Sequence, residues 1–318
     1  MDLEKIGMRL ILLAVLALIT ATTAQADQLV IGAWNIADLH HEEGVEARPG
    51  IGTRRSSGDF DTIIRYSDLF GREGGPADVV ALQEIGTEEG AYRIFPQSEY
   101  DVLMSSRYHA DGGSGGDIYT AIAVRKGSGI TIIRQEDLMG LAIADSEGYS
   151  TRAGTAALLE FNGTRFWFLS VHLKSSCSHV ENADTSLRDD CQLLWQQMDP
   201  LVGWIEAQRS EGLPFIIAGD FNRRFRQFQN EGPVWEIING GDLNEPWMSQ
   251  HPETITRKCP TRKGNSTQPI DWILVDASVA HWFVEGSFWE RRFSNDDVQT
   301  SGRRISDHCP ISIAIDLE

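Results

Sequence analysis

Basic residues are scarce in this sequence. Its 318 residues include 28 lysines and arginines against 46 acidic residues, which gives a formal net charge of −18. A protein this acidic does not attract polyanions through its overall field, so an anionic substrate must be captured by a bound metal ion or a local basic cluster. Five arginines could form such a cluster, although we favour a solvated surface position for each: Arg54, Arg55, Arg223, Arg224 and Arg226.

Two common motifs are also missing. The sequence has no G-x-x-x-x-G-K-[ST] loop, which argues against a P-loop nucleotide hydrolase. None of its four cysteines forms a Cys-x-x-Cys pair, so nothing indicates a zinc site built on cysteine.

The chain contains a single long apolar run, Leu10–Thr23. This run is short for a membrane span, follows Lys5 and Arg9, and precedes the small-residue pattern Ala24-Gln25-Ala26. We therefore predict a signal peptide over residues 1–26 and one domain over residues 27–318 of a secreted or periplasmic protein. An uncleaved N-terminal anchor is the alternative.

The four cysteines lie in the predicted mature chain. In an exported protein an even number of cysteines indicates disulfides, and four allow three connectivities. Cys177 and Cys191 flank the polar loop Ser178–Asp190, and we predict that they pair, which leaves Cys259 and Cys309 for a second bond. Two buried free thiols are the alternative.

Short apolar runs alternate with helix-like segments along the chain. Asp59–Phe70 begins with a candidate Asp cap, and Cys191–Arg209 has apolar residues at helical spacing. Mixed strands and helices predict one α/β domain with buried sheets. The predicted strands are Gln28–Trp34, Asp78–Leu82, Tyr119–Val124, Ile130–Arg134, Ala156–Phe161, Arg165–His172, Pro214–Ala218, Ile270–Val275 and Ile311–Ile315.

Several of these runs end in a residue that can bind metal, contact phosphate or carry a proton. Asn35, Glu84 and His172 each follow or end such a run, and Gly219-Asp220-Phe221-Asn222 follows another. Enzymes place chemistry at the ends of rigid strands because position is well defined there. The pattern predicts a polar site assembled from several strands.

Acidic residues that lie beside apolar sequence indicate a metal-binding site. Glu84, Asp220 and Asp271 directly adjoin apolar residues, and Asp307 lies two residues after Ile305; a nearly buried carboxylate needs a partner or a metal ion. With few basic residues nearby, oxygen ligands favour a hard divalent cation such as Mg²⁺. His172 and His308 are the candidates for proton transfer, and Asn35 and Asn222 offer amides for a phosphoryl oxygen.

Six of these motifs together resemble the endonuclease/exonuclease/phosphatase superfamily, whose fold is DNase I-like. The resemblance covers about residues 28 to 317. It implies a four-layer α/β sandwich of two packed mixed β-sheets flanked by helices. The motifs are Trp34-Asn35, Gln83-Glu84, Val171-His172, Gly219-Asp220-Phe221-Asn222, Asp271 and Ser306-Asp307-His308. The segment His172–Ser175 with Cys177, Cys191 and Gly219–Arg223 is similar to a secreted bacterial subgroup that contains disulfides.

The resemblance also implies roles for individual residues. Glu84 would be the principal metal ligand beside Asn35, and Asp307 a further metal or structural carboxylate. Asp220 and Asn222 would lie at the cleavage centre, where Asp220 would orient or deprotonate the attacking water. His308 would contact the scissile phosphate, and Asp271 would fix its tautomer. His172 would be a second catalytic histidine, and Arg152 and Asn35 would bind substrate together with Asn222. The implied cofactor is Mg²⁺, with Mn²⁺ or Ca²⁺ as alternatives.

Some features stay open at this level. The acidic partner expected for His172 should fall near Asp117–Tyr119, but the sequence does not fix it. Asp38 could contribute to the metal site or only form a turn. For His40–Glu43 we favour a solvated loop over a metal cluster, and for the aromatic stretch Trp282–Trp289 a core strand and turn over a membrane-touching or base-stacking surface.

These inferences predict a monomeric, metal-dependent phosphodiesterase, and a nuclease in particular, with nucleic acid as substrate and no stable protein partner. Two alternatives remain. One is a phosphoesterase acting on sphingomyelin-like lipids, inositol phosphates or small nucleotides. The other is a non-catalytic binding module on the same fold, against which the intact set of site residues argues.

Overall fold

Two six-stranded sheets form the centre of the molecule in the computed structural model, which describes residues 28–113, 116–144, 149–177, 189–225, 232–252, 259–263 and 269–317. The first sheet has the order β11 (Trp289–Glu290), β12 (Ile311–Asp316), β1 (Gln28–Leu39), β2 (Val79–Ile85), β4 (Tyr119–Arg125), β3 (Tyr100–Met104). The second has the order β5 (Thr131–Gln135), β6 (Thr155–Phe161), β7 (Thr164–His172), β8 (Phe215–Asp220), β10 (Asp271–Asp276), β9 (Met248–His251).

Each sheet is mixed. The pairs β1–β2 and β7–β8 are parallel, and the other neighbours are antiparallel. Parallel neighbours end at the same edge, so Asn35 lies opposite Gln83, and His172 lies opposite Asp220. Because β10 runs antiparallel to β8, its first residue, Asp271, pairs with Asp220. The sheet topology thus gathers the predicted site residues.

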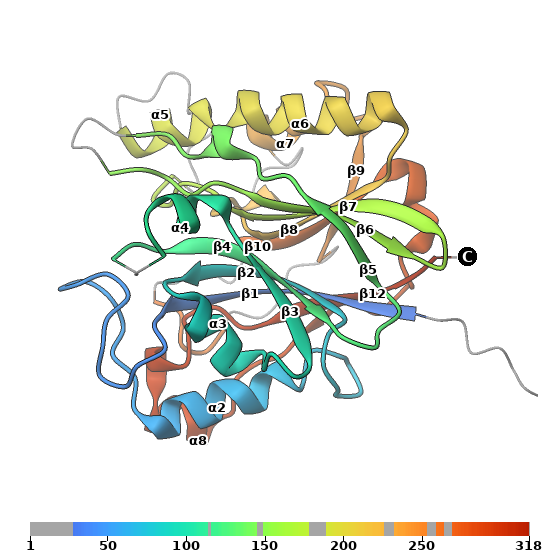
Figure 1. The fold of residues 1–318 in the computed structure, drawn as a ribbon. Coiled ribbons are helices and arrows are strands. Elements are labelled where there is room, and N and C mark those ends of the chain that lie inside the picture. Colours follow the sequence, from blue (N-terminus) through green and yellow to red (C-terminus); the bar gives the residue numbers. More distant parts are fainter. Residues whose placement is uncertain are drawn as a thin grey trace, which may run out of the picture.

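The inner faces of the sheets pack against each other, and helices cover the outer faces (Figure 1). The helices α2 (Ser57–Ser67), α3 (Glu88–Ile94) and α8 (Asn295–Thr300) lie on the side of the first sheet. The helices α5 (Asp189–Gln196), α6 (Met198–Glu211) and α7 (Gly232–Ile238) lie on the side of the second. This arrangement confirms the predicted four-layer α/β sandwich. The shorter segments are α4 (Ser106–Ala110), η1 (Met139–Leu141), η3 (Ala277–Trp282) and η4 (Gly302–Arg304).

All nine predicted strands are present, with ends shifted by a few residues. The sequence analysis missed β3, β9 and β11. Each of these lies at the edge of its sheet, where a strand is covered less completely and its sequence is less continuously apolar.

The two predicted helices need correction. Ser56, not Asp59, caps α2: its side chain accepts a hydrogen bond from the Asp59 backbone N–H, and the Asp59 carboxylate accepts one from the Ser56 backbone N–H. The predicted Cys191–Arg209 helix is two helices, α5 and α6, separated at Gln197. Pro200 explains this break, because its ring would clash with the carbonyl of Gln196, four residues earlier, in a continuous helix.

Both predicted disulfides are formed. Cys177 is bonded to Cys191 and Cys259 to Cys309, as is typical of proteins from oxidising compartments. The predicted signal peptide, residues 1–26, lies outside the described residues. None of the helices that the structure describes has the length and apolar character needed to span a lipid bilayer.

Candidate active site

A polar cleft of ≈ 570 Å³ lies where strand ends from both sheets meet. The ends of β2, β7 and β8 and the loop before β12 contribute Glu84, His172, Asp220 and His308 to its lining. Other predicted residues also line it: Asp38, Arg152, Asn222 and Asp307. Residues spread over more than 270 positions of the sequence therefore share one neighbourhood.

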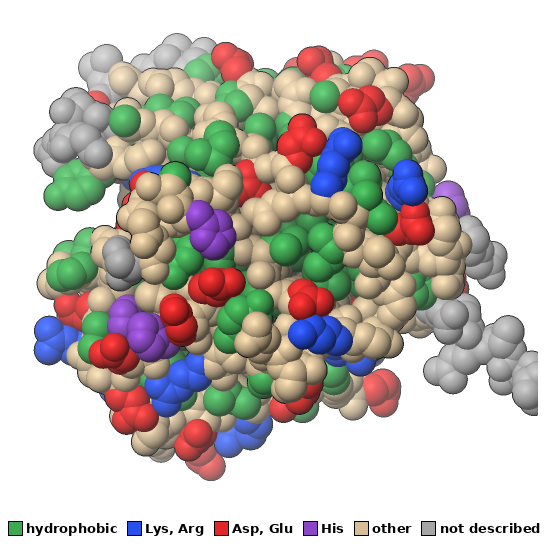
Figure 2. Space-filling model, viewed as in Figure 1, with side chains coloured by type: hydrophobic (Ala, Val, Ile, Leu, Met, Phe, Trp, Pro, Cys, Tyr) green, Lys and Arg blue, Asp and Glu red, His purple; other side chains and the backbone are tan. Residues whose placement is uncertain are grey.

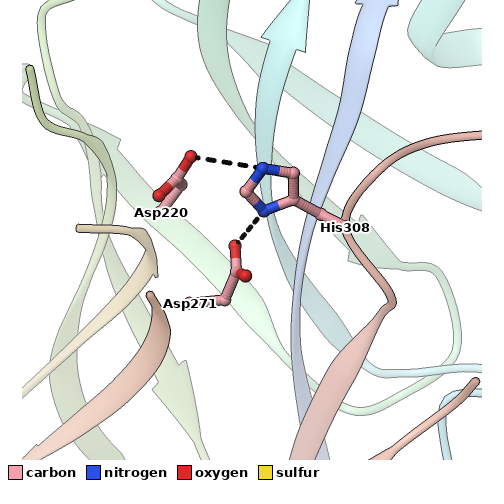
Figure 3. A group of neighbouring side chains, drawn as sticks. All are labelled: Asp220, Asp271 and His308. Atoms are coloured by element: carbon pink, nitrogen blue, oxygen red, sulfur yellow. Dashed lines mark hydrogen bonds and ion pairs between the residues drawn. The ribbon is translucent and has the colours of Figure 1, made fainter. Parts of the chain in front are cut away.

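His308 lies between two carboxylates (Figure 3). Its Nδ1 is 2.7 Å from Oδ1 of Asp271, and its Nε2 is 3.7 Å from Oδ2 of Asp220. Burial alone would lower the pKa of His308, but Asp271 and Asp220 outweigh it and raise that pKa to about 10. The imidazole is therefore positively charged at neutral pH, and Asp271 fixes its orientation.

The loop that carries His308 is held by hydrogen bonds. The His308 backbone N–H donates to Oγ of Ser306 over 2.9 Å, and the indole N–H of Trp34 donates to the His308 carbonyl over 3.0 Å. Ser306 Oγ in turn donates to the carbonyl of Asn35 over 2.6 Å. These bonds tie the loop to the end of β1.

Asn35 and Glu84 form the second part of the site. Nδ2 of Asn35 donates to Oε1 of Glu84 over 3.1 Å and to Oδ2 of Asp220 over 3.2 Å. The other Glu84 oxygen accepts from the backbone N–H of Asp38 over 3.0 Å. Burial and the neighbouring Asp38 carboxylate raise the pKa of Glu84, and burial raises that of Asp220 to about 6. Glu84 also has a φ of 60°, a left-handed conformation that costs energy and is common at functional sites.

His172 is buried beside the same carboxylates. Its Nε2 is 3.6 Å from Oδ2 of Asp220 and 3.8 Å from Oε1 of Glu84. Burial, together with the positive charge of Arg152, lowers the pKa of His172 well below its usual range. The expected partner near Asp117–Tyr119 is not there: Asp117 forms an ion pair with Arg107 over 2.9 Å. Among the described residues, nothing accepts or donates a hydrogen bond at Nδ1 of His172.

Arg152 and Asn222 complete the predicted set. Arg152 lines the cleft, and its buried Nε has no hydrogen-bond partner within the described ranges. Burial lowers the pKa of Arg152. Asn222 has a φ of 52°, and its backbone N–H donates to Oδ1 of Asp220 over 2.8 Å, which orients that carboxylate. Its Nδ2 donates to the carbonyl of Leu173 over 3.1 Å.

The remaining carboxylates of the cleft are paired with arginines. Asp38 accepts from Nε of Arg48 over 2.5 Å, and Asp307 forms a close ion pair with Arg303. Asp38 is also near enough to Glu84 to raise its pKa, so it lies beside the predicted metal ligand.

The donor set fits a hard divalent cation. The carboxylates of Glu84 and Asp38 repel each other, which is the kind of repulsion that a cation relieves, and Asn35 holds Oε1 of Glu84 through its Nδ2. Asp220, Asp271 and His308 also place one ligand atom each within 4.8 Å of the others. The short bond between His308 and Asp271 favours a proton-transfer role for this group over metal binding.

Two arginines differ from the prediction of solvated surface charges. Arg55 is 2% exposed, and its guanidinium donates to the carbonyls of Ile36, Ala37 and Asp38. Ala37 and Asp38 have φ values of 51° and 55°, so Arg55 stabilises the strained end of β1 beside the site. Arg223 is likewise 2% exposed and donates to the carbonyl of Cys177.

The structure describes two of the other three arginines of that group. Arg54 is exposed and pairs with Glu46, Arg224 is partly buried, and Arg226 lies outside the described residues. On the face of the described chain that Figure 2 presents, acidic and basic side chains are interspersed. The burial of an individual arginine has no local sequence signal, because it depends on neighbours distant in the chain.

Two open features have structural explanations. The rings of His40 and His41 stack with centroids 4.4 Å apart, and His41 bonds to Thr87 and Glu42. This segment is not among the groups of described residues that could hold a metal ion. Trp282 is buried in η3 against Phe166, and Trp289 belongs to β11, so both are part of the packed structure.

Comparisons with known proteins agree with this geometry. Residues 33–308 match the Endonuclease/Exonuclease/phosphatase family. The chain belongs to this family. A search of curated proteins finds no match.

Solved structures show the same fold at low identity. A family member from Bacteroides thetaiotaomicron has a TM-score of 0.58 at 15% identity, with 92% of this chain and 98% of that chain covered. D. rerio TDP2, in complex with a single-strand DNA product, has a TM-score of 0.54 at 17% identity, covering 91% and 99%. A mannosyl-6-phosphatase from Bacteroides thetaiotaomicron has a TM-score of 0.55 at 16% identity, covering 91% and 100%. At these identities the likeness establishes the fold, and the family establishes a phosphoesterase scaffold.

Proposed function

We propose that the protein is a secreted or periplasmic, divalent-metal-dependent phosphodiesterase, and that it cleaves nucleic acid. One observation carries this proposal: the buried His308, hydrogen-bonded to Asp271, and the carboxylates of Glu84 and Asp220 face one cleft. This arrangement combines a charge for a phosphate oxygen, a base for water and oxygen ligands for a cation. A non-catalytic binding module would not require these groups to converge.

The metal would be held by Glu84 and Asn35, with Asp307 or Asp38 close by, and when bound it would polarise the phosphate as a Lewis acid. Asp220, whose pKa is raised to about 6, orients the attacking water and accepts its proton. Asn222 and Asn35 hold the two oxygens of Asp220 in place.

The charged His308 donates a hydrogen bond from Nε2 to a non-bridging oxygen of the phosphate, or protonates the leaving oxygen. Asp271 keeps Nδ1 protonated and the ring aligned. Arg152 offers an unpaired buried N–H to the same phosphate, and His172, kept neutral by burial, offers a neutral imidazole beside Asp220 and Glu84.

Cationic residues around the cleft favour a polyanionic substrate. Arg48, Arg262, Lys263 and Arg303 line it although the chain as a whole carries a net charge of −18. We expect few phosphate contacts and a shallow dependence of affinity on salt concentration. The solved relative with single-strand DNA product supports nucleic acid, whereas the mannosyl-6-phosphatase indicates that this fold also serves small phosphoesters.

A substrate panel tests the proposal. Purified residues 27–318 should nick supercoiled plasmid with Mg²⁺ or Mn²⁺, and EDTA should abolish the reaction. The Asp220→Asn variant, purified identically, controls for contaminating nuclease. If plasmid stays intact while sphingomyelin, an inositol phosphate or a small nucleotide is hydrolysed, the nuclease proposal is wrong and the catalytic centre stands.

A further inference from the structure

A short segment that the sequence analysis did not connect with the site, Cys259–Lys263, is fastened to the loop that carries His308. The Cys259–Cys309 disulfide joins it to the residue directly after His308. The hydroxyl of Thr261 donates to the carbonyl of Ser306, and the Arg262 backbone N–H donates to the carbonyl of Cys259 over 3.1 Å. The segment is therefore a tight turn fixed at two points against the catalytic loop.

This turn presents Arg262 to the cleft. The Arg262 side chain is 20% exposed and lines the cleft together with His308 and Asp220. Its nearest carboxylate oxygen is Oδ2 of Asp271, at 3.8 Å from Nη1, which is long for an ion pair. Asp271 meanwhile makes its short hydrogen bond to His308 with its other oxygen.

The guanidinium of Arg262 makes fewer close contacts than those of Arg48 and Arg303, which also line the cleft. Arg48 bonds to Asp38 over 2.5 Å, and Arg303 pairs closely with Asp307. The Arg262 side chain, in contrast, makes no hydrogen bond to any described residue, and within the described ranges its one ion-pair contact is the 3.8 Å one to Asp271. A partly buried guanidinium with free N–H groups in a cleft is suited to bind a phosphate oxygen.

We propose that Arg262 is a substrate-binding residue that contacts a non-bridging phosphate oxygen on the His308 side of the cleft, and that the Cys259–Cys309 disulfide holds it there. This inference rests on the proposed phosphoesterase function and goes beyond it by assigning a specific phosphate contact to a disulfide-tethered turn.

The test compares Arg262→Gln with Arg165→Gln. Arg165 pairs with Glu160 over 2.7 Å on an exposed part of β7, so its replacement removes the same charge away from the cleft. We measure kcat and KM with Mn²⁺ on plasmid and on bis(p-nitrophenyl) phosphate, a small phosphodiester, and the thermal unfolding of each variant. Arg262→Gln should raise KM on the order of 10- to 100-fold, the range for a hydrogen bond to a charged group, with Arg262→Lys intermediate and Arg165→Gln unchanged.

Salt dependence separates binding from a structural role. Loss of one phosphate contact should reduce the slope of log(kcat/KM) against log[salt] on nucleic acid by about 0.7–0.9. A fall in kcat with KM and this slope unchanged, or behaviour equal to that of Arg165→Gln, overturns the inference. If plasmid stays intact but the small phosphodiester is cleaved with an Arg262-dependent KM, the nuclease proposal is wrong and this inference holds. Absence of any phosphoester hydrolysis overturns both.

The disulfide provides an independent measurement. The Cys259→Ser/Cys309→Ser variant should raise KM as Arg262→Gln does, and combining the two should add little, because both remove the same contact. The Cys177→Ser/Cys191→Ser variant serves as the matched control and should combine additively with Arg262→Gln. If the effects of Cys259→Ser/Cys309→Ser and Arg262→Gln on log KM add in full, the disulfide does not act by holding Arg262 in the cleft.

Discussion

His172 and His308 face the same carboxylate from different sheets, yet one ring is neutral and the other is positively charged. Oδ2 of Asp220 is 3.6 Å from Nε2 of His172 and 3.7 Å from Nε2 of His308. Both rings are buried, at 3% and 8% exposure. The pKa of His172 is lowered well below its usual range by burial, whereas that of His308 is raised to about 10.

The difference comes from the neighbour at Nδ1. Asp271 lies 2.7 Å from Nδ1 of His308, while Nδ1 of His172 has no partner among the described residues and Arg152 adds a positive charge nearby. Burial penalises the charged form of any imidazole, so a hydrogen-bonded carboxylate, which His308 has and His172 lacks, decides whether the ring is charged. The same cleft therefore contains one positively charged and one neutral histidine.

Loss of the charged ring should have the largest effect. We expect His308→Ala to lower kcat on the order of 10²-fold or more, because it removes the charge that stabilises the phosphate oxygens and the proton donor. Steady-state kinetics on plasmid or the small phosphodiester measures this. Wild-type turnover in a folded His308→Ala protein would remove His308 from its assigned role.

Replacing only Asp271 tests whether this carboxylate causes the difference in pKa between the two histidines. The Asp271 carboxylate favours protonated His308, so Asp271→Asn should lower the pKa of His308 from about 10 and leave a smaller charged fraction at neutral pH. NMR titration of the imidazole measures this shift, and kcat should fall roughly 10- to 100-fold, as for other orienting partners. An unchanged His308 titration would show that Asp271 does not set its charge.

The smallest effect is expected at the neutral histidine. His172→Gln replaces a neutral hydrogen-bonding group with another, so activity should fall by about tenfold or less, the value of one neutral hydrogen bond. Kinetics measured beside His308→Ala gives the comparison directly. Equal losses in the two variants would mean that the rings share one role, contrary to their different surroundings.

Much of the site could be predicted from local sequence because its residues end buried strands. Asn35, Glu84, His172 and Asp220 all follow apolar runs whose parallel neighbours end at one edge, which brings them together. The resemblance to the family supplied Asp271 as the partner of His308, and the geometry agrees with it. The residues that were missed or misjudged, Arg55 and Arg262, have no local signature.

Local sequence predicted most of the strands, the two helical regions and the chemical groups of the site, since hydrophobic pattern and residue chemistry are local properties. It favoured the disulfide pairing that the structure contains but left other pairings open. The tertiary structure sets which histidines are charged and which arginine side chains have no close partner among the described residues. Arg55 is buried against backbone carbonyls, Asp117 pairs with Arg107 and not with His172, and Arg262 reaches the cleft on a turn joined to Cys309. Charge and hydrogen bonding depend on distances between residues far apart in the chain, and these distances are fixed only by packing of the complete fold.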